Sequence, residues 1–337
     1  MEQQRTIWTV IVTVVVAVLV VVSIMAFQSV KEGGNKVIDP IGDIVPQDYE
    51  PNEALEADLS SLPAIKEGHY ALWAVDSGNN PLLIWQFRID SQGFIVDLNN
   101  LPQSSVVVTP GVDLTTMQSF FVSLEKGDII ASEPSSSVIL STTKKTKNSH
   151  ALAFPHDFSA VGGSYILATP TNGANTQETA GVWFVNVEND TDLASLNLPA
   201  SPAGWVYQGW VLYQSKPLNI GRFNNVAGKD SFSNFSGPRS FPAFPGEDFL
   251  TNAPANLNLK FPLNLADGQG LVMVTLEPVV AVGSDLTSPS GADPTGEDIF
   301  ALTLLQSQIP KDLEARVSTS LNNVFKSPTG SIKVLTR

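Results

Sequence analysis

The sequence contains no cysteine among its 337 residues, and only three histidines. The lack of cysteine excludes disulfide bonds, a lipid attached through cysteine and zinc sites built on thiolates. Three histidines leave little capacity for acid–base catalysis near neutral pH. No phosphate-binding glycine loop or Gly-x-Ser-x-Gly motif occurs either. The sequence therefore predicts a protein that is not an enzyme, with no catalytic residue, metal or cofactor.

Basic residues are also scarce. The chain has 19 Lys and Arg against 33 Asp and Glu, which gives a net charge of −14, and no basic stripe is present. Nucleic-acid binding depends on Lys and Arg that neutralise phosphates. The sequence therefore predicts no nucleic-acid partner.

One long uncharged run is present, from Ile7 to Phe27. At about 1.5 Å per residue a helix of this length spans roughly 30 Å, the thickness of a bilayer core. Residues 1–28 are therefore predicted to form a single transmembrane helix. The alternative is a signal peptide cleaved after Ala26. With the helix retained, we expect a single-pass protein of the cytoplasmic membrane whose C-terminal domain is extracytoplasmic.

The segment that follows is acidic and rich in proline. Between Asp39 and Asp58 there are seven acidic residues and no basic residue. Such a composition is typical of a solvated linker. Residues 29–67 are therefore predicted to be an acidic stalk, although "KVIDPIGDIV" could form a strand within it.

Beyond Gly68 the pattern is all-β. Short apolar runs such as "HYALWAVD", "SYILATP" and "GVWFVNV" are bounded by Gly, Pro, Asn or Ser. Many short strands with frequent turns favour an immunoglobulin-like β-sandwich. A helix is conceivable only at "PKDLEARVSTSLNNVF" (310–325), where acids come first and Lys326 follows the end.

An internal repeat organises these strands. "HYALWAVDSGNNPLLIWQF" (69–87) aligns with "VYQGWVLYQSKPLNIGRF" (206–223), and "FFVSLEK" aligns with "VMVTLEP". The sequence therefore predicts tandem β-sandwich repeats over 68–170 and 171–309, with a C-terminal tail over 310–337. The residues expected to have a structural role in both repeats are Tyr70, Trp73, Phe87, Glu125, Tyr207, Trp210, Phe223 and Glu277.

The ordered motifs "YALWAVD", "GWVYQGWVLYQSKPLNIGRF", "FPGEDFL" and "VMVTLEP" resemble the extracytoplasmic domain of anti-sigma-K-type factors. The resemblance covers about two-thirds of the chain and implies a β-sandwich held outside the membrane by one helix. Such regulators carry a cytoplasmic sigma-binding domain, whereas only six residues precede the apolar run here. The resemblance therefore implies the fold and topology, together with a role in regulation.

Glu125 and Glu277 occupy matching places inside apolar runs. A buried carboxylate needs hydrogen-bond donors, most simply backbone N–H groups. Because paired acid–base catalysis requires two carboxylates in one cleft, a structural role is expected for each.

Residues of the aromatic hairpin that the first repeat does not share are candidates for binding. These are Trp205, Tyr213 and Arg222. Alternation places Trp205 and Tyr213 on the face of their strand opposite Trp210.

Four other clusters carry weaker signals. "STTK" (141–144) matches a Ser-x-x-Lys pattern but follows an apolar strand, so a strand end with solvated lysines is expected. His150, His156 and Asp157, with His69 elsewhere, have no common metal-ligand spacing. Two acidic loops could hold Ca²⁺, but polar turns are the expected interpretation. Their carboxylates are Glu188, Asp190, Asp192, Asp293, Glu297 and Asp298.

These observations together favour a membrane-anchored protein that binds or senses a protein partner in sigma-factor or envelope signalling. A cell-surface structural or adhesive module is the alternative, and a hydrolase with an unrecognised site is the third possibility.

Overall fold

Strands dominate the computed structural model, which describes residues 53–65, 68–127, 130–173, 176–188, 191–240, 242–279 and 302–335, with two short strands before them. These residues also contain the 3₁₀ helices η2 (Leu114–Thr116), η3 (Glu178–Ala180), η4 (Ala255–Leu257) and η5 (Leu265–Asp267). The predicted all-β class is confirmed.

The predicted anchor, residues 1–28, lies outside the described residues. Among those described, no helix has the length and apolar character needed to cross a membrane. The chain divides into two compact units, Met1–Tyr49 and Glu50–Arg337. In the first unit, β1 (Val37–Ile38) pairs antiparallel with β2 (Ile44–Val45), so part of "KVIDPIGDIV" is strand.

Two nine-stranded sheets make up the second unit, and all their strand pairs are antiparallel. We name the sheet that contains β4 the first copy. Its order is β6–β5–β4–β8–β9–β10–β22–β3–β7. The strands are β3 (Ala54–Asp58), β4 (His69–Val75), β5 (Pro81–Ile89), β6 (Ile95–Val96), β7 (Val106–Val108), β8 (Ser119–Glu125), β9 (Val138–Lys145), β10 (Ser149–Ala153) and β22 (Thr329–Val334).

The sheet that contains β16 is named the second copy. Its order is β17–β16–β19–β20–β21–β11–β12–β18, and β15 pairs with β11 beside this path. The strands are β11 (Gly162–Leu167), β12 (Gly181–Trp183), β15 (Leu196–Asn197), β16 (Trp205–Tyr213), β17 (Lys216–Phe223), β18 (Gly246–Asp248), β19 (Gly270–Pro278), β20 (Thr303–Gln308) and β21 (Thr319–Asn323). A separate hairpin joins β13 (Val185–Glu188) to β14 (Thr191–Ala194).

The two copies repeat one arrangement strand for strand. The path β5–β4–β8–β9–β10–β22–β3–β7 corresponds to β17–β16–β19–β20–β21–β11–β12–β18. The irregularities of register correspond as well. The ladder shifts at Leu72/Trp73 in β4 and at Gly209/Trp210 in β16, and again at Val122/Ser123 in β8 and Val274/Thr275 in β19. Because bulges are specific features of a sheet, their recurrence supports the predicted repeat.

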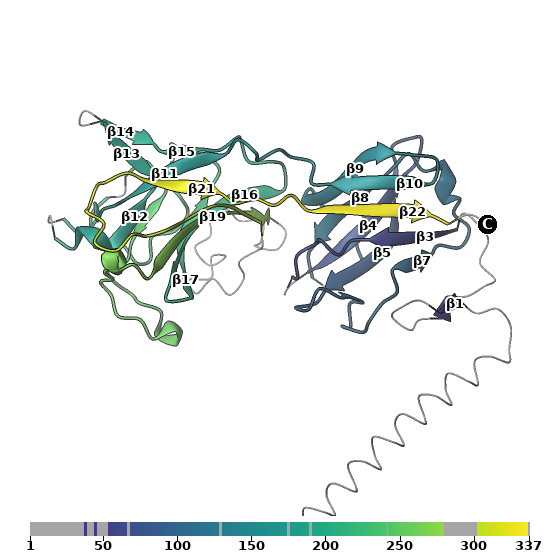
Figure 1. Cartoon of the computed structure of the whole chain (residues 1–337), viewed down its shortest axis with the longest axis horizontal. Coiled ribbons are helices and arrows are strands. Elements are labelled where there is room, and N and C mark those ends of the chain that lie inside the picture. The colour runs from purple at the N-terminus through teal and green to yellow at the C-terminus, as the bar shows by residue number, and fades with distance from the viewer. Residues whose placement is uncertain are drawn as a thin grey trace, which may run out of the picture. The chain divides into compact units, whose positions relative to one another are not determined.

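The last strand of each repeat lies in the sheet of the other repeat. Along the chain β11 follows β10, yet it pairs with β21 in the second copy. Likewise β22 follows β21 but pairs with β10 and β3 in the first copy, as the yellow ribbon in Figure 1 shows. The sequences "GSYIL" (163–167) and "GSIKV" (330–334) are alike, as equivalent strands should be. The chain therefore contains a reciprocal strand exchange between its own two repeats.

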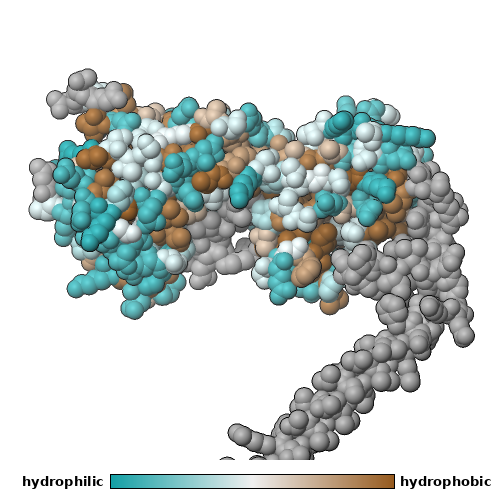
Figure 2. Space-filling model, viewed as in Figure 1, coloured by the Kyte–Doolittle hydropathy of each residue, from teal (hydrophilic) through white to brown (hydrophobic). Residues whose placement is uncertain are grey.

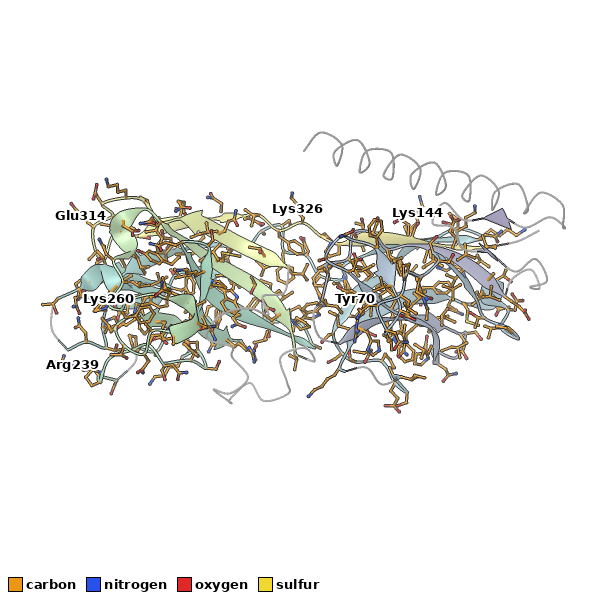
Figure 3. The ribbon with its side chains drawn as sticks, turned by 90° about the horizontal axis from the view of Figure 1, so that it is seen from below. Tyr70, Lys144, Arg239, Lys260, Glu314 and Lys326 are labelled. Carbon is orange, nitrogen blue, oxygen red and sulfur yellow. The ribbon has the colours of Figure 1, made fainter. Side chains whose placement is uncertain are left out.

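The segments that carry the exchanged strands pack against each other. These segments, 154–161 and 324–328, are named the crossover clasp. Asn323 donates a hydrogen bond from Nδ2 to the Phe158 carbonyl at 2.8 Å, and the Phe154 N–H donates to the Pro328 carbonyl at 3.1 Å. The ring of Phe325 lies 5.4 Å from that of Phe158 and 5.9 Å from that of Phe154. Lys326, labelled in Figure 3, is an exposed residue of the clasp.

The core forms from the inner faces of these sheets. Tyr70 stacks on Phe87 with ring centroids 5.6 Å apart, and Tyr207 packs on Phe223 at 5.8 Å. The two tyrosine hydroxyls each donate to a proline carbonyl a few residues upstream, Pro63 at 2.8 Å and Pro199 at 3.0 Å. Figure 3 shows Tyr70 inside the first copy. The same aromatic pair with the same hydrogen bond therefore anchors each copy.

The sheets cut across the predicted domain boundaries. The range 29–67, predicted as a stalk, contains β3 of the first copy, because Leu55 and Ala57 are apolar on alternate positions and face the core. The predicted first repeat, 68–170, ends with β11, which belongs to the second copy. The predicted tail, 310–337, supplies β21 and β22.

The helix considered at 310–325 does not form. Its second half is strand β21, with Leu321 buried and its neighbours exposed. Ser, Thr and Asn are weak helix formers, and pairing with β11 and β20 satisfies their backbone groups. The favourable order of charges, with acidic residues at the start of this segment and Lys326 after its end, does not outweigh that strand pairing.

Candidate functional site

Each copy contains one buried relay of hydrogen bonds that ends on the predicted glutamate. In the first copy the Trp73 indole donates to the Ser123 hydroxyl at 2.8 Å, and that hydroxyl donates to Glu125. In the second copy Trp210 donates to the Thr275 hydroxyl at 3.0 Å, and Thr275 donates to Glu277.

Glu125 also accepts the backbone N–H of Ser135 at 3.0 Å, the kind of partner expected from the sequence. Trp73 and Trp210 are buried, but they lie on the sheet face opposite Tyr70 and Tyr207. Because the relay occurs in both copies, we interpret it as part of the shared fold.

The second copy adds a buried cation to its relay. Arg222 donates from Nε to Gln208 Oε1 at 3.2 Å, and Gln208 donates in turn to Asn219 at 2.9 Å. Burial lowers the pKa of the Arg222 guanidinium, and the Glu277 carboxylate opposes that change. In the first copy Gln86 occupies the position of Arg222 and contacts His69 instead.

The three predicted binding residues do not form an exposed surface. Trp205, Tyr213 and Arg222 expose only 3%, 7% and 6% of their surface. Trp205 packs edge-on against Phe154 at 5.4 Å, and the Tyr213 hydroxyl donates to Asp267 at 2.6 Å. Trp205 and Tyr213 lie on the inner face of β16, where alternation directs them into the core. Their absence from the first repeat therefore accompanies a different packing of the core, and a role for these three residues in binding remains a prediction.

The other motifs lie apart from one another. "STTK" is part of strand β9, with an exposed Lys144, so its serine does not open a helix. His150 is buried edge-on against Phe120, and burial beside Lys145 lowers its pKa to about 4. His156 and Asp157 are exposed in the crossover clasp, and His69 is buried in β4. Across the described ranges, no group of three His, Asp or Glu side chains could hold a metal ion.

The two acidic loops lie mainly outside the described residues. This holds for Asp190, Asp293, Glu297, Asp298 and the side chain of Glu188. Asp192 is described and lies in β14, beside the pocket discussed next.

An apolar pocket of about 180 Å³ opens on the outer face of the second copy. It is named the outer-face pocket and is lined by Ile166, Ala168, Pro170, Trp183, Val185, Val187, Asp192, Pro242 and Arg316. Ile166 and Trp183 are direct partners across β11 and β12, and together with Ala168 and Val185 they form a small cluster separate from the main core. Figure 2 shows that the visible face of the described residues has apolar patches among hydrophilic and intermediate ones.

Exposed apolar residues adjoin the pocket. Val187 in its wall is 45% exposed, and Val317, next to Arg316, is 44% exposed. Large apolar side chains exposed next to a cavity are typical of a contact surface. The pocket is smaller than the roughly 300 Å³ of the smallest common small-molecule sites, so it suits one inserted side chain.

Arg316 places a cation at the rim of the pocket. Its backbone has φ 64°, an unusual conformation for arginine, and its N–H donates to the Leu167 carbonyl at 2.8 Å. The guanidinium lies 3.5 Å from Glu178 and remains 60% exposed. A non-glycine residue held in the left-handed region is often found at functional sites. The rim therefore has a positive group, next to Glu178, that solvent and a partner can reach.

The first copy has a polar surface at the equivalent place. Strand equivalence matches Ile166 with Lys333 and Trp183 with Glu56. In the first copy these two residues form an exposed ion pair, with Nζ 3.9 Å from Oε2. Because the same fold accepts an ion pair there, the fold does not require the apolar pocket of the second copy. The difference marks the outer-face pocket as the candidate binding site.

Buried carboxylates lie directly beneath the pocket. Asp248 accepts the Trp183 indole N–H at 2.7 Å and the backbone N–H of Thr171 at 2.9 Å, which fixes the Trp183 ring. Burial raises the pKa of Asp248 despite these donors and raises that of Glu247 well above its usual value. Among the described residues, Glu247 Oε2 has no hydrogen-bond partner.

Asp230 accepts the backbone N–H groups of Phe232 at 2.8 Å and Gly246 at 2.9 Å, so it ties its own loop to the first residue of β18. Burial raises its pKa to about 7. A Cβ at Gly221 would lie 2.1 Å from Asp230 Oδ1, which explains why glycine stands where the first repeat has Trp85.

Because these carboxyls have raised pKa values in the folded protein, we predict that the free energy of unfolding falls as the pH rises. A carboxyl whose pKa is raised on folding stabilises the fold below its unfolded pKa, and that stability is lost as the pH rises through the folded pKa. For Asp230, with values of 3.8 and about 7, the free energy of unfolding should fall by about 2–3 kcal/mol between about pH 5 and pH 8. Urea unfolding at both pH values measures this. Asp230→Asn should reduce the dependence of the free energy of unfolding on pH, whereas the control Glu56→Gln, at an exposed site, should leave it as it is. An unchanged pH dependence in Asp230→Asn would show that Asp230 is not its source.

The chain has no significant match to a protein-family model, a curated protein or a solved structure.

Proposed function

We propose that this protein is a membrane-anchored, extracytoplasmic binding protein without catalytic activity. In this proposal residues 1–28 span the cytoplasmic membrane once, and each copy is a β-sandwich of the immunoglobulin-like kind. The partner is another protein, and the binding event acts in sigma-factor or envelope signalling. The likeness of the hairpin and "VMVTLEP" motifs to anti-sigma-K-type extracytoplasmic domains supports the signalling role.

One observation carries the binding role. The outer faces of β11 and β12 are apolar around a pocket, whereas the equivalent faces of β22 and β3 have an ion pair. Interface hot spots combine an apolar anchor pocket with a neighbouring arginine. Trp183, Val187 and Arg316 supply such a set, and the exposed Val317 extends it.

A partner segment with one apolar side chain next to a carboxylate matches this surface. The apolar side chain fills the pocket against Trp183, and the carboxylate approaches Arg316. The hydrogen bond from Trp183 to Asp248 keeps the floor of the pocket in place before binding, which lowers the cost of association.

We predict that Val187→Asp abolishes the regulatory effect of the protein without unfolding it. Deleting the gene should change the transcripts controlled by an extracytoplasmic-function sigma factor, and the wild-type gene should restore them. Val187→Asp should fail to restore them, because a charge in a hot-spot pocket costs about 2 kcal/mol or more in binding, roughly a 30-fold loss of affinity.

Leu82→Asp is the matched control, since Leu82 is an exposed strand residue of the first copy. It should restore the transcripts fully. Unchanged transcripts after the deletion, with saturable binding of the protein to cells or glycans, would contradict the signalling role and favour the adhesive one.

A further inference from the structure

The reciprocal strand exchange within the chain also defines a surface for a second copy of the chain. The slot between β10 and β3 in the first copy is filled by β22, which follows β21 of the second copy along the chain. The slot recognises its strand by local features. Ile332 and Val334 enter the core, and each residue of β22 has a defined partner on β10 or β3.

The slot also fixes the register of the strand. A Cβ at Gly330 would lie 2.8 Å from the Asp58 carbonyl oxygen, so only glycine fits there. The backbone N–H of Thr329 donates to the Ser61 hydroxyl at 2.8 Å at the entrance of the slot. None of these contacts depends on which chain supplies the strand.

The connection to β22 is short, and its middle is exposed to solvent. The crossover segment 324–328 contains the exposed Lys326 and Ser327 between β21 and β22. Exchange between identical elements is a low-cost route to dimers, because it reuses contacts that the closed chain already makes. When β22 fills the slot of another chain and not that of its own, only the contacts of the crossover clasp change.

From this topology we infer that two copies of the chain form a dimer by exchanging β22, so that each C-terminal strand completes the first copy of its neighbour. The interface is the slot between β10 and β3, and the partner is β22 of an identical chain. This interaction is independent of the outer-face pocket, which lies on the second copy.

The absence of native cysteine allows a direct test in the full-length protein. Ala151 in β10 is the direct partner of Ser331 in β22. Opposite residues of an antiparallel pair have Cβ atoms about 4.5–5.5 Å apart, close enough for a disulfide after small adjustment. One tagged chain with Ala151→Cys and a second, differently tagged chain with Ser331→Cys are expressed together in one membrane and oxidised.

We expect a disulfide-linked heterodimer whose cross-linked peptides contain positions 151 and 331. The double variant Ala151→Cys/Ser331→Cys, oxidised when dilute, should lock the closed chain and lose the ability to dimerise. A second variant that lacks Lys326 and Ser327 should shift the wild-type equilibrium toward the dimer, because a shortened hinge hinders closure within one chain. A heterodimer cross-link that is absent at every expression level, or a dimer that forms without it, would overturn the inference.

Discussion

A chain that ends at Phe325 is expected to lose the fold of the first copy while the second copy stays folded. The deleted strand β22 lies between β10 and β3, so its removal also separates β3 and β7 from the rest of their sheet. Burial of Ile332 and Val334 alone contributes about 1.5–3 kcal/mol each. With the strand pairing added, the loss approaches the whole stability of a typical domain, about 5–15 kcal/mol.

Hydrogen exchange followed by mass spectrometry distinguishes the copies. Amides of β4 and β8 should exchange rapidly in the truncated chain, whereas those of β16 and β19 should remain protected, because β11 completes the second copy from within the remaining chain. Lys333→Ala is the matched control, since this side chain lies on the exposed outer face of β22. Protection of β4 that survives the truncation would contradict the exchanged topology.

The second large effect is expected from Glu277→Ala. Glu277 is buried, accepts the Thr275 hydroxyl and opposes the charge of the buried Arg222. Removing it takes away the carboxylate that opposes the buried charge of Arg222, which should lower the free energy of unfolding by about 3–5 kcal/mol. The equivalent change Glu125→Ala removes hydrogen bonds but leaves no buried arginine, and it should cost about 1–3 kcal/mol.

Chemical denaturation of the two variants and of the double variant Arg222→Leu/Glu277→Ala measures these effects. The double variant should recover part of the loss, because it removes the buried charge together with its partner. Equal losses for Glu125→Ala and Glu277→Ala, or additive losses in the double variant, would show that Arg222 and Glu277 do not act together.

The repeat could be found in the sequence because the shared residues have the same buried roles in both copies. Tyr70 and Tyr207 donate to proline carbonyls, and Trp73 and Trp210 begin the two relays. A position that must both pack in the core and donate a hydrogen bond accepts few amino-acid types. The two repeats therefore keep the same residue types in the same order and spacing.

The exchange of β11 and β22 could not be predicted from periodicity. Alternation shows that "GSYIL" and "GSIKV" are strands with one apolar face. The gap between β10 and β3 and the gap between β21 and β12 both accept such a strand, so alternation does not say which strand fills which gap. The likeness of these two segments was the available signal, since equivalent strands at the ends of both repeats imply equivalent slots. Which slot each strand fills depends on contacts distant in sequence, such as Gly330 against Asp58.

The candidate site was missed for a different reason. Residues absent from the first repeat, such as Trp205 and Tyr213, were the candidates for binding, yet they are buried in the core of the second copy. The useful signal was the continuous apolar run "GVWFV", in which both faces of a strand are apolar. Once strand equivalence matches Trp183 with Glu56, that run indicates an outer face that has diverged.

The comparison of the two outer faces depends on the exchanged position of β22 between β10 and β3. A disulfide between Glu56→Cys and Lys333→Cys tests it most directly, since these exposed residues are direct partners on β3 and β22. In dilute, oxidised, folded protein we predict an intrachain cross-link between the two positions and none in the control Asp192→Cys/Lys333→Cys, whose first residue lies in β14. Thiols that stay free at positions 56 and 333 in the folded chain would show that β22 does not lie beside β3.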